Sequence, residues 1–163
     1  MNDPLRVILD CSVFWRAFFS PLGTSRACTN LILEGVVAHF ISTEILVEVR
    51  DVLTRPETLR MFPSVTTDDA ESFISHIVDQ TTFVGRVPRA FQLPRNQKDE
   101  PYIDLAALVD ADFIVTTDKD MLDLMTGIDV ESKQFRQSFR GLKIVKPEEF
   151  LRIVAAIEIS LKP

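Results

Sequence analysis

Two acidic residues each follow a short apolar run, and these positions are the first that could do chemistry. Asp10 ends the run Val7-Ile8-Leu9, and Asp118 follows the run 113–117. Apolar runs without polar alternation are typical of strands buried on both faces, as in parallel sheets. Ligands of open α/β sheets bind beyond the carboxyl ends of the strands. We therefore predict that the two strands are neighbours and present both carboxylates at one edge.

Two further carboxylates lie on predicted helices. Glu48 borders the apolar face of a helix expected over 43–53, and Asp99 precedes a helix that is apolar nearly all round. Each has an alternative explanation without chemistry. Glu48 could be a surface residue paired with Arg50, and Asp99 could be a helix N-cap. Together with the two strand-end acids, both are interpreted as members of one site.

Several carboxylates without soft ligands favour a hard divalent ion, Mg²⁺ or Mn²⁺. Such a cluster can activate water and neutralise charge on a phosphodiester. In this scheme Asp10, Asp99 and Asp118 hold the metal, while Glu48 holds metal or orients the water. Asp104 is a weaker candidate ligand. The residues expected to lie next to these acids and orient them are Ser12, Thr116 and Asp120.

The chain lacks the motifs of several other enzyme classes. It contains no Gly-rich phosphate loop, no Gly-x-Ser-x-Gly turn and no Cys/His cluster with zinc spacing. A phosphatase with an aspartate nucleophile would often have a second acid two residues after the first, where this chain has Ser12. Dinucleotide oxidoreductases, P-loop NTPases and α/β serine hydrolases are therefore disfavoured.

Composition is that of an ordinary globular protein. With 163 residues, 46% hydrophobic and 26% charged, we expect a single domain over 1–163. No apolar run approaches the roughly 20 residues that cross a bilayer, and no signal peptide is recognisable, so a cytoplasmic protein is expected. Cys11 and Cys28 are expected to be reduced thiols. The net charge of −6 argues mildly against nucleic acid but is compatible with a nuclease whose acids hold metal.

One stretch, residues 132–141, interleaves basic and aromatic side chains. Lys133, Arg136 and Arg140 are candidate RNA contacts. The alternative is an irregular loop whose Phe135 and Phe139 pack inward while the charges face water.

The order of these features resembles the PIN-domain family of metal-dependent ribonucleases. In particular it is similar to the branch described as toxin components of bacterial toxin–antitoxin systems. The stretches that resemble the family are 7–13, 42–49, 98–106, 111–120 and 144–151. The family commonly has Asp-Thr-Asn at the first strand end, where this chain has Asp10-Cys11-Ser12. It also often has Asp-Pro shortly before the third acid, where this chain has Asn96-Gln97.

The resemblance implies an α/β fold with a central parallel sheet of four or five strands flanked by helices. It also implies cleavage of single-stranded RNA with Mg²⁺ or Mn²⁺, a homodimer, and an antitoxin partner. It assigns metal binding to Asp10, Glu48, Asp99 and Asp118. Two other hypotheses stay open: a catalytically silent PIN-like module that binds RNA or a protein, and a metal-dependent phosphatase of small substrates.

Overall fold

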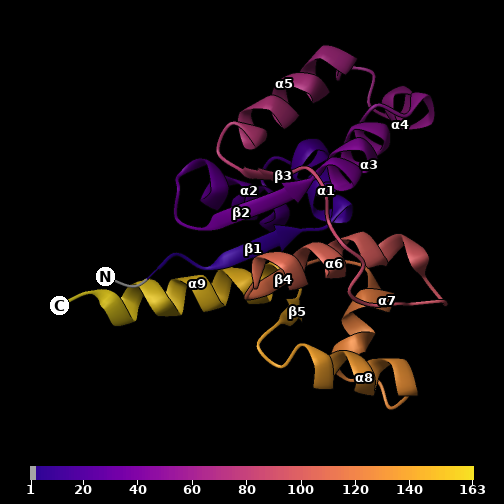
Figure 1. Ribbon diagram of the computed structural model, residues 1–163. Coiled ribbons are helices and arrows are strands. Elements are labelled where there is room, and N and C mark those ends of the chain that lie inside the picture. The colour runs from indigo at the N-terminus through magenta and orange to yellow at the C-terminus, as the bar shows by residue number, and fades with distance from the viewer. Residues whose placement is uncertain (1–2) are drawn as a thin grey trace.

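Five short strands form one parallel sheet in the order β3-β2-β1-β4-β5 (Figure 1). The computed structural model describes residues 3–163. The five-stranded sheet with helices around it confirms the predicted α/β fold. The strands are β1 (Arg6–Leu9), β2 (Ala38–Ser42), β3 (Thr82–Val84), β4 (Phe113–Val115) and β5 (Lys143–Val145).

Helices connect the strands and cover the sheet. They are α1 (Cys11–Phe19), α2 (Thr24–Leu33), α3 (Thr43–Leu53), α4 (Pro56–Met61), α5 (Thr67–Val78), α6 (Glu100–Val109), α7 (Lys119–Leu122), α8 (Val130–Ser138) and α9 (Pro147–Leu161). Short 3-10 turns lie at Gln97–Asp99 and Asp123–Met125. No helix within residues 3–163 is long and apolar enough to cross a membrane.

The two predicted strands are neighbours, as expected from their sequences. β1 pairs with β4 in parallel, with Val7 opposite Phe113 and Leu9 opposite Val115. Residues 7–9 are almost fully buried, which explains why β1 is apolar at every one of these positions. Extending the register by one residue brings Asp10 beside Thr116 at the carboxyl edge of the sheet.

The helices form two groups around this sheet (Figure 1). Helices α3, α4 and α5 gather on the β3 side, and α7 and α8 lie on the β5 side. Helix α6 contacts β1, β2 and β4, and its buried residues join one continuous hydrophobic core. Because α6 crosses the centre of the sheet, its N-terminus is fixed beside the strand-end acids.

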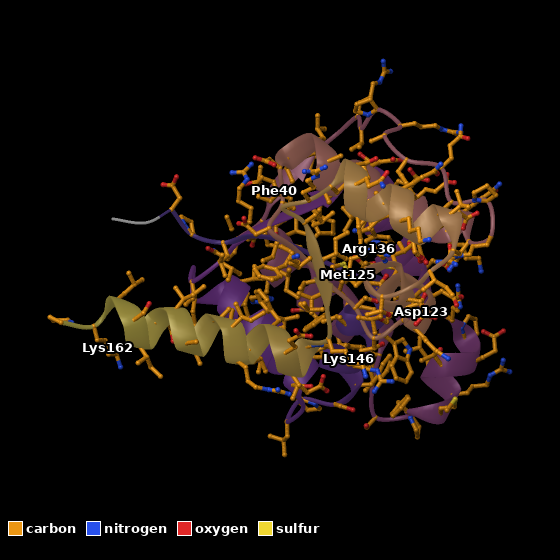
Figure 2. The ribbon with its side chains drawn as sticks, turned by 90° about the horizontal axis from the view of Figure 1, so that it is seen from below. Phe40, Asp123, Met125, Arg136, Lys146 and Lys162 are labelled. Carbon is orange, nitrogen blue, oxygen red and sulfur yellow. The ribbon has the colours of Figure 1, made fainter. Side chains whose placement is uncertain are left out.

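Helix α9 packs against the core at its N-terminal end and is exposed to solvent at its C-terminal end. Phe150 and Val154 are buried, while Ile159 and Leu161 are exposed. Figure 2 shows Lys146 at the start of this helix against the body and Lys162 at its far end.

A buried histidine, His39, lies in the centre of the fold on β2. Its Nδ1 is 2.9 Å from the Thr81 hydroxyl, which donates its own hydrogen to the carbonyl of Ile77. Nδ1 must therefore donate, so Nε2 is an unprotonated nitrogen without a partner in the described part of the chain. Burial lowers the pKa of His39 from 6.5 to about 3.

This pKa predicts a loss of stability in acid. Between pH 6.5 and 3 the unfolded chain binds a proton at this residue and the folded chain does not, so the free energy of unfolding falls as pH falls. The contribution is about 1.4 kcal/mol per pH unit, or about 2 kcal/mol at pH 5 relative to pH 7. Urea unfolding of wild type and His39→Gln at both pH values measures it, with exposed His76→Gln as the control. Equal pH dependence in wild type and His39→Gln would contradict this account.

Candidate active site

Asp10 lies at the carboxyl end of the central strand and is 4% exposed. Its backbone N–H continues the sheet by donating to the carbonyl of Val115. Its Oδ1 accepts the N–H of Cys11 at 2.8 Å and thereby caps helix α1. Its Oδ2 accepts two hydroxyl groups, from Ser12 at 2.8 Å and from Thr116 at 2.6 Å. Three hydrogen bonds thus fix the orientation of this carboxylate.

The same two hydroxyl groups tie Asp10 to the loop that holds Asp118. The Ser12 oxygen accepts the N–H of Thr117 at 3.2 Å, and the Thr116 oxygen accepts the N–H of Asp118 at 2.9 Å. Each hydroxyl therefore donates to Asp10 and accepts from the loop after β4. Although Ser12 is shorter than the asparagine common in the similar family, it reaches both partners.

Glu48 on α3 is held by two residues from other parts of the chain. The Tyr102 hydroxyl donates to Oε2 at 2.8 Å, and the Cys11 thiol donates to Oε1 at 3.2 Å. Tyr102 also accepts the N–H of Cys11 at 3.2 Å. The expected surface partner, Arg50, instead pairs with Glu71 at 2.9 Å, so the interpretation of Glu48 as half of a surface ion pair is wrong.

Asp99 is a buried carboxylate that does not cap its helix. It is 5% exposed at the end of the 3-10 turn before α6, and its side chain makes no capping hydrogen bond. Its Oδ2 accepts the side-chain amide of Asn96 at 2.6 Å. Asp99 thus stands at the predicted N-cap position of α6, but no capping hydrogen bond explains why this carboxylate is buried.

The charges of the other predicted acids act on Asp99. The pKa of Asp99 is raised from 3.8 to about 7, first by burial and then by the negative charges of Asp118, Asp10, Asp120 and Glu48. One side chain therefore experiences the repulsion of all the others. A divalent cation would relieve that repulsion.

The thiol and phenol beside Glu48 remain protonated. Burial, followed by the charges of Asp10 and Glu48, raises the pKa of Cys11 above its ordinary value. Burial and the same acids raise the pKa of Tyr102. Both groups therefore act as hydrogen-bond donors to Glu48, and Cys11 is not a thiolate ligand.

Sequence reasoning missed Tyr102 and Asn96 as partners of the acids. Tyr102 is the only tyrosine of the chain and lies in an apolar helix, three residues after Asp99. A buried tyrosine hydroxyl usually has a hydrogen-bond partner, which was the available signal. Asn96 is in a loop whose conformation could not be predicted.

Two other predicted acids have different surroundings. Asp104 accepts the N–H groups of Ala90 and Phe91 through Oδ1, so it fixes the loop before α6. Asp120 is exposed, and its N–H donates to Oδ1 of Asp118 at 2.9 Å. Its charge reaches Asp99, but its carboxylate makes no hydrogen bond within the described residues.

The basic and aromatic stretch is helical over 132–138, so the expectation of an irregular loop is wrong there, but Phe135 and Phe139 pack inward as that alternative predicted. It forms most of α8, with Phe135 fully buried. The Arg136 guanidinium donates to the carbonyls of Leu124 and Gly127, next to Met125 in Figure 2. Arg136 thus stabilises the fold here, whereas Lys133 and Arg140 are exposed.

The chemistry of the donor set fits a hard divalent ion, because the candidate ligands are all carboxylates and the neighbouring thiol is protonated. Among residues 3–163, however, no group of three or more His, Cys, Asp or Glu side chains is arranged to hold a metal as it stands.

A parallel α/β sheet with acids at its carboxyl edge defines a class of metal-dependent hydrolases and phosphotransferases. The family comparison narrows this class. A model of the PIN domain matches residues 6–120, so the chain belongs to the PIN-domain family, whose members are typically nucleases. The match includes Asp10, Glu48, Asp99 and Asp118. A search of curated proteins finds no match.

The raised pKa of Asp99 predicts that this residue destabilises the metal-free protein. Because the folded chain holds the proton more tightly than the unfolded chain, stability falls as pH rises from about 4 to about 7. Asp99→Asn should therefore raise the melting temperature in EDTA at pH 8 by about 2–4 °C, corresponding to about 1 kcal/mol after allowance for solvent screening.

Adding Mn²⁺ should reverse the order of the two proteins, because wild type gains stability by binding the ion and the variant gains less. Asp79→Asn, an exposed acid at the end of α5, is the control. A lower melting temperature for Asp99→Asn than for wild type in EDTA would contradict the prediction.

Proposed function

We propose that the protein is a divalent-metal-dependent endoribonuclease that hydrolyses phosphodiester bonds of single-stranded RNA. The observation that supports this most is the buried carboxylate of Asp99, whose pKa is raised first by burial and then by the charges of four other acids. A bound divalent cation would offset both effects. Membership of a family of nucleases favours a phosphodiester as substrate.

The acids and their neighbours would have separate roles in metal binding and catalysis. Asp10, Asp99 and Asp118 would hold Mg²⁺ or Mn²⁺, which when bound neutralises phosphate charge and lowers the pKa of water. Oδ1 of Asp10 accepts a single hydrogen bond and keeps a lone pair for this purpose. Glu48, oriented by Tyr102 and Cys11, would bind the ion or orient the attacking water. Ser12, Thr116 and Asp120 would support the acids around them.

Loss of one metal-binding carboxylate should abolish turnover. Asp10→Asn keeps the size of the side chain but removes its charge, so cleavage of a mixed single-stranded RNA should fall more than about 100-fold. The assay compares both proteins with Mg²⁺, with Mn²⁺ and with EDTA, with Asp79→Asn as the matched acid-to-amide control. Asp79 precedes β3 and so lies at the opposite edge of the sheet.

The same assay separates this proposal from its alternatives. No cleavage by folded wild-type protein that still binds RNA would favour the silent binding module. Turnover of phosphomonoesters but not of RNA would favour the small-substrate phosphatase. Cleavage that survives Asp10→Asn would contradict the proposed site.

Tyr102 should contribute by positioning Glu48. Tyr102→Phe removes the donor to Oε2 while leaving the buried ring in place, so kcat should fall about 10–100-fold. The concentration of Mn²⁺ needed for half-maximal rate should rise, which a purely structural loss would not cause. An unchanged metal requirement would contradict a role for Tyr102 at Glu48.

We further propose a toxin role, supported by the resemblance of the sequence to toxin components. Such a nuclease would act on cytoplasmic RNA, form a homodimer and be inhibited by an antitoxin protein. Expression of wild type, but not of Asp10→Asn, should arrest bacterial growth. Equal growth of both strains, with equal amounts of folded protein, would argue against this role.

A further inference from the structure

The segment between β3 and α6 carries several cations in an acidic protein. Residues 85–98 contain Arg86, Arg89, Arg95 and Lys98 and no acid, while the whole chain has a net charge of −6. Arg95 pairs with Asp129 at 3.3 Å. Across residues 3–163, the other three cations form no ion pair, and all three are exposed. Of these cations, Arg89 lines the groove described below, and Arg86 lines the hollow beside it.

Buried contacts hold the segment in one conformation. Oδ1 of Asp104 accepts the N–H groups of Ala90 and Phe91, and Glu100 accepts the N–H of Leu93 at 2.8 Å. The Leu93 side chain is fully buried. The segment between β3 and α6 is therefore a rigid wall, and the exposed cations project from it.

A groove of about 490 Å³ lies between this wall and the starts of α3 and α6. An adjoining hollow of about 290 Å³ shares Glu44, Val87, Pro101 and Asp104 with it and extends it to Arg86. Together they run along the carboxyl edge of β2 and β3, which is the edge that also holds the acids.

The groove lies beside the candidate active site along the chain. Gln97 and Glu100, in its wall, flank Asp99. Glu44, also in the wall, precedes Glu48 by about one turn of α3. None of the four candidate acids lines the groove itself, so a ligand there would lie beside the acids rather than among them.

The lining combines one cation, Arg89, with three carboxylates, Glu44, Glu100 and Asp104, so it suits the polar edge of a base rather than a phosphate group. Arg89, Gln92 and Gln97 offer hydrogen-bond donors, and the amide groups also accept, as the edge of a base requires. Asp104 is 8% exposed, and its Oδ2 makes no hydrogen bond in the described residues, so it can accept from a base amino group. Pro94 gives an apolar surface for the ring. The volume is in the range of small-ligand pockets.

We propose that this groove binds the nucleotide next to the scissile phosphate of single-stranded RNA, with Arg89 as its main contact. The inference rests on the proposed function, because it needs RNA as the substrate. Duplex RNA is excluded as the preferred ligand, since its base edges are paired and cannot enter the groove.

Binding without cleavage tests this inference separately from activity. Short fluorescent oligoribonucleotides of A, C, G or U are titrated with protein in EDTA, and again with Ca²⁺ so that the acids are neutralised. Arg89→Gln should bind the preferred oligonucleotide about 10-fold more weakly than wild type, as for a specific contact. Gln92→Ala should reduce the difference in affinity between the four bases. The control is Arg152→Gln, an exposed cation on α9 that should bind as wild type does.

The possible failures are distinguishable. If wild type cleaves RNA and Arg89→Gln binds RNA as tightly as wild type, the proposed nucleotide-binding groove is wrong and the proposed nuclease activity stands. Protein that never cleaves RNA but loses binding with Arg89→Gln would support the groove and overturn the nuclease. No binding by wild type in either condition, or an equal loss in Arg152→Gln, would overturn the groove. Arg89 is exposed, so equal melting temperatures are expected and confirm that the variant folds.

Discussion

The structure of the site depends on one buried carboxylate, Asp10, and on the two hydroxyl groups that hold it. Ser12 and Thr116 each donate to Asp10 and accept a backbone N–H from the loop after β4. Because each hydroxyl donates one hydrogen bond and accepts another, moving either side chain to a different rotamer would break both. Strands β1 and β4 are therefore held together directly before Asp118.

Around these hydrogen bonds, the fold gathers negatively charged side chains, two of which are buried. A parallel sheet brings the ends of β1 and β4 together, α3 brings Glu48, and the turn before α6 brings Asp99. The protein stabilises this arrangement with donors from Tyr102, Cys11 and Asn96 rather than with cationic side chains. The negative charge of these acids is therefore not neutralised by cationic side chains.

The sequence predicted the sheet correctly because apolar runs are local signals, and it placed the four candidate acids at strand ends and on helices for the same reason. It could not predict the residues that hold those acids, because Tyr102 and Glu48 are far apart in the chain and meet only when α6 packs against α3. Helix α8 was not predicted as a helix, since its mostly polar sequence buries only Phe135 among its apolar residues. The cap formed by Asp129 with the N–H of Ser132 was the local signal that could have indicated it.

The most direct test is a crystal structure with Mn²⁺, located by its anomalous scattering. The account predicts an anomalous peak coordinated by carboxylate oxygens of Asp10, Asp99 and Asp118, with Glu48 coordinating it or bonded to its water. It also predicts that the acids move closer together than in the metal-free protein. No peak at this edge of the sheet at millimolar Mn²⁺, in crystals of intact protein, would contradict it.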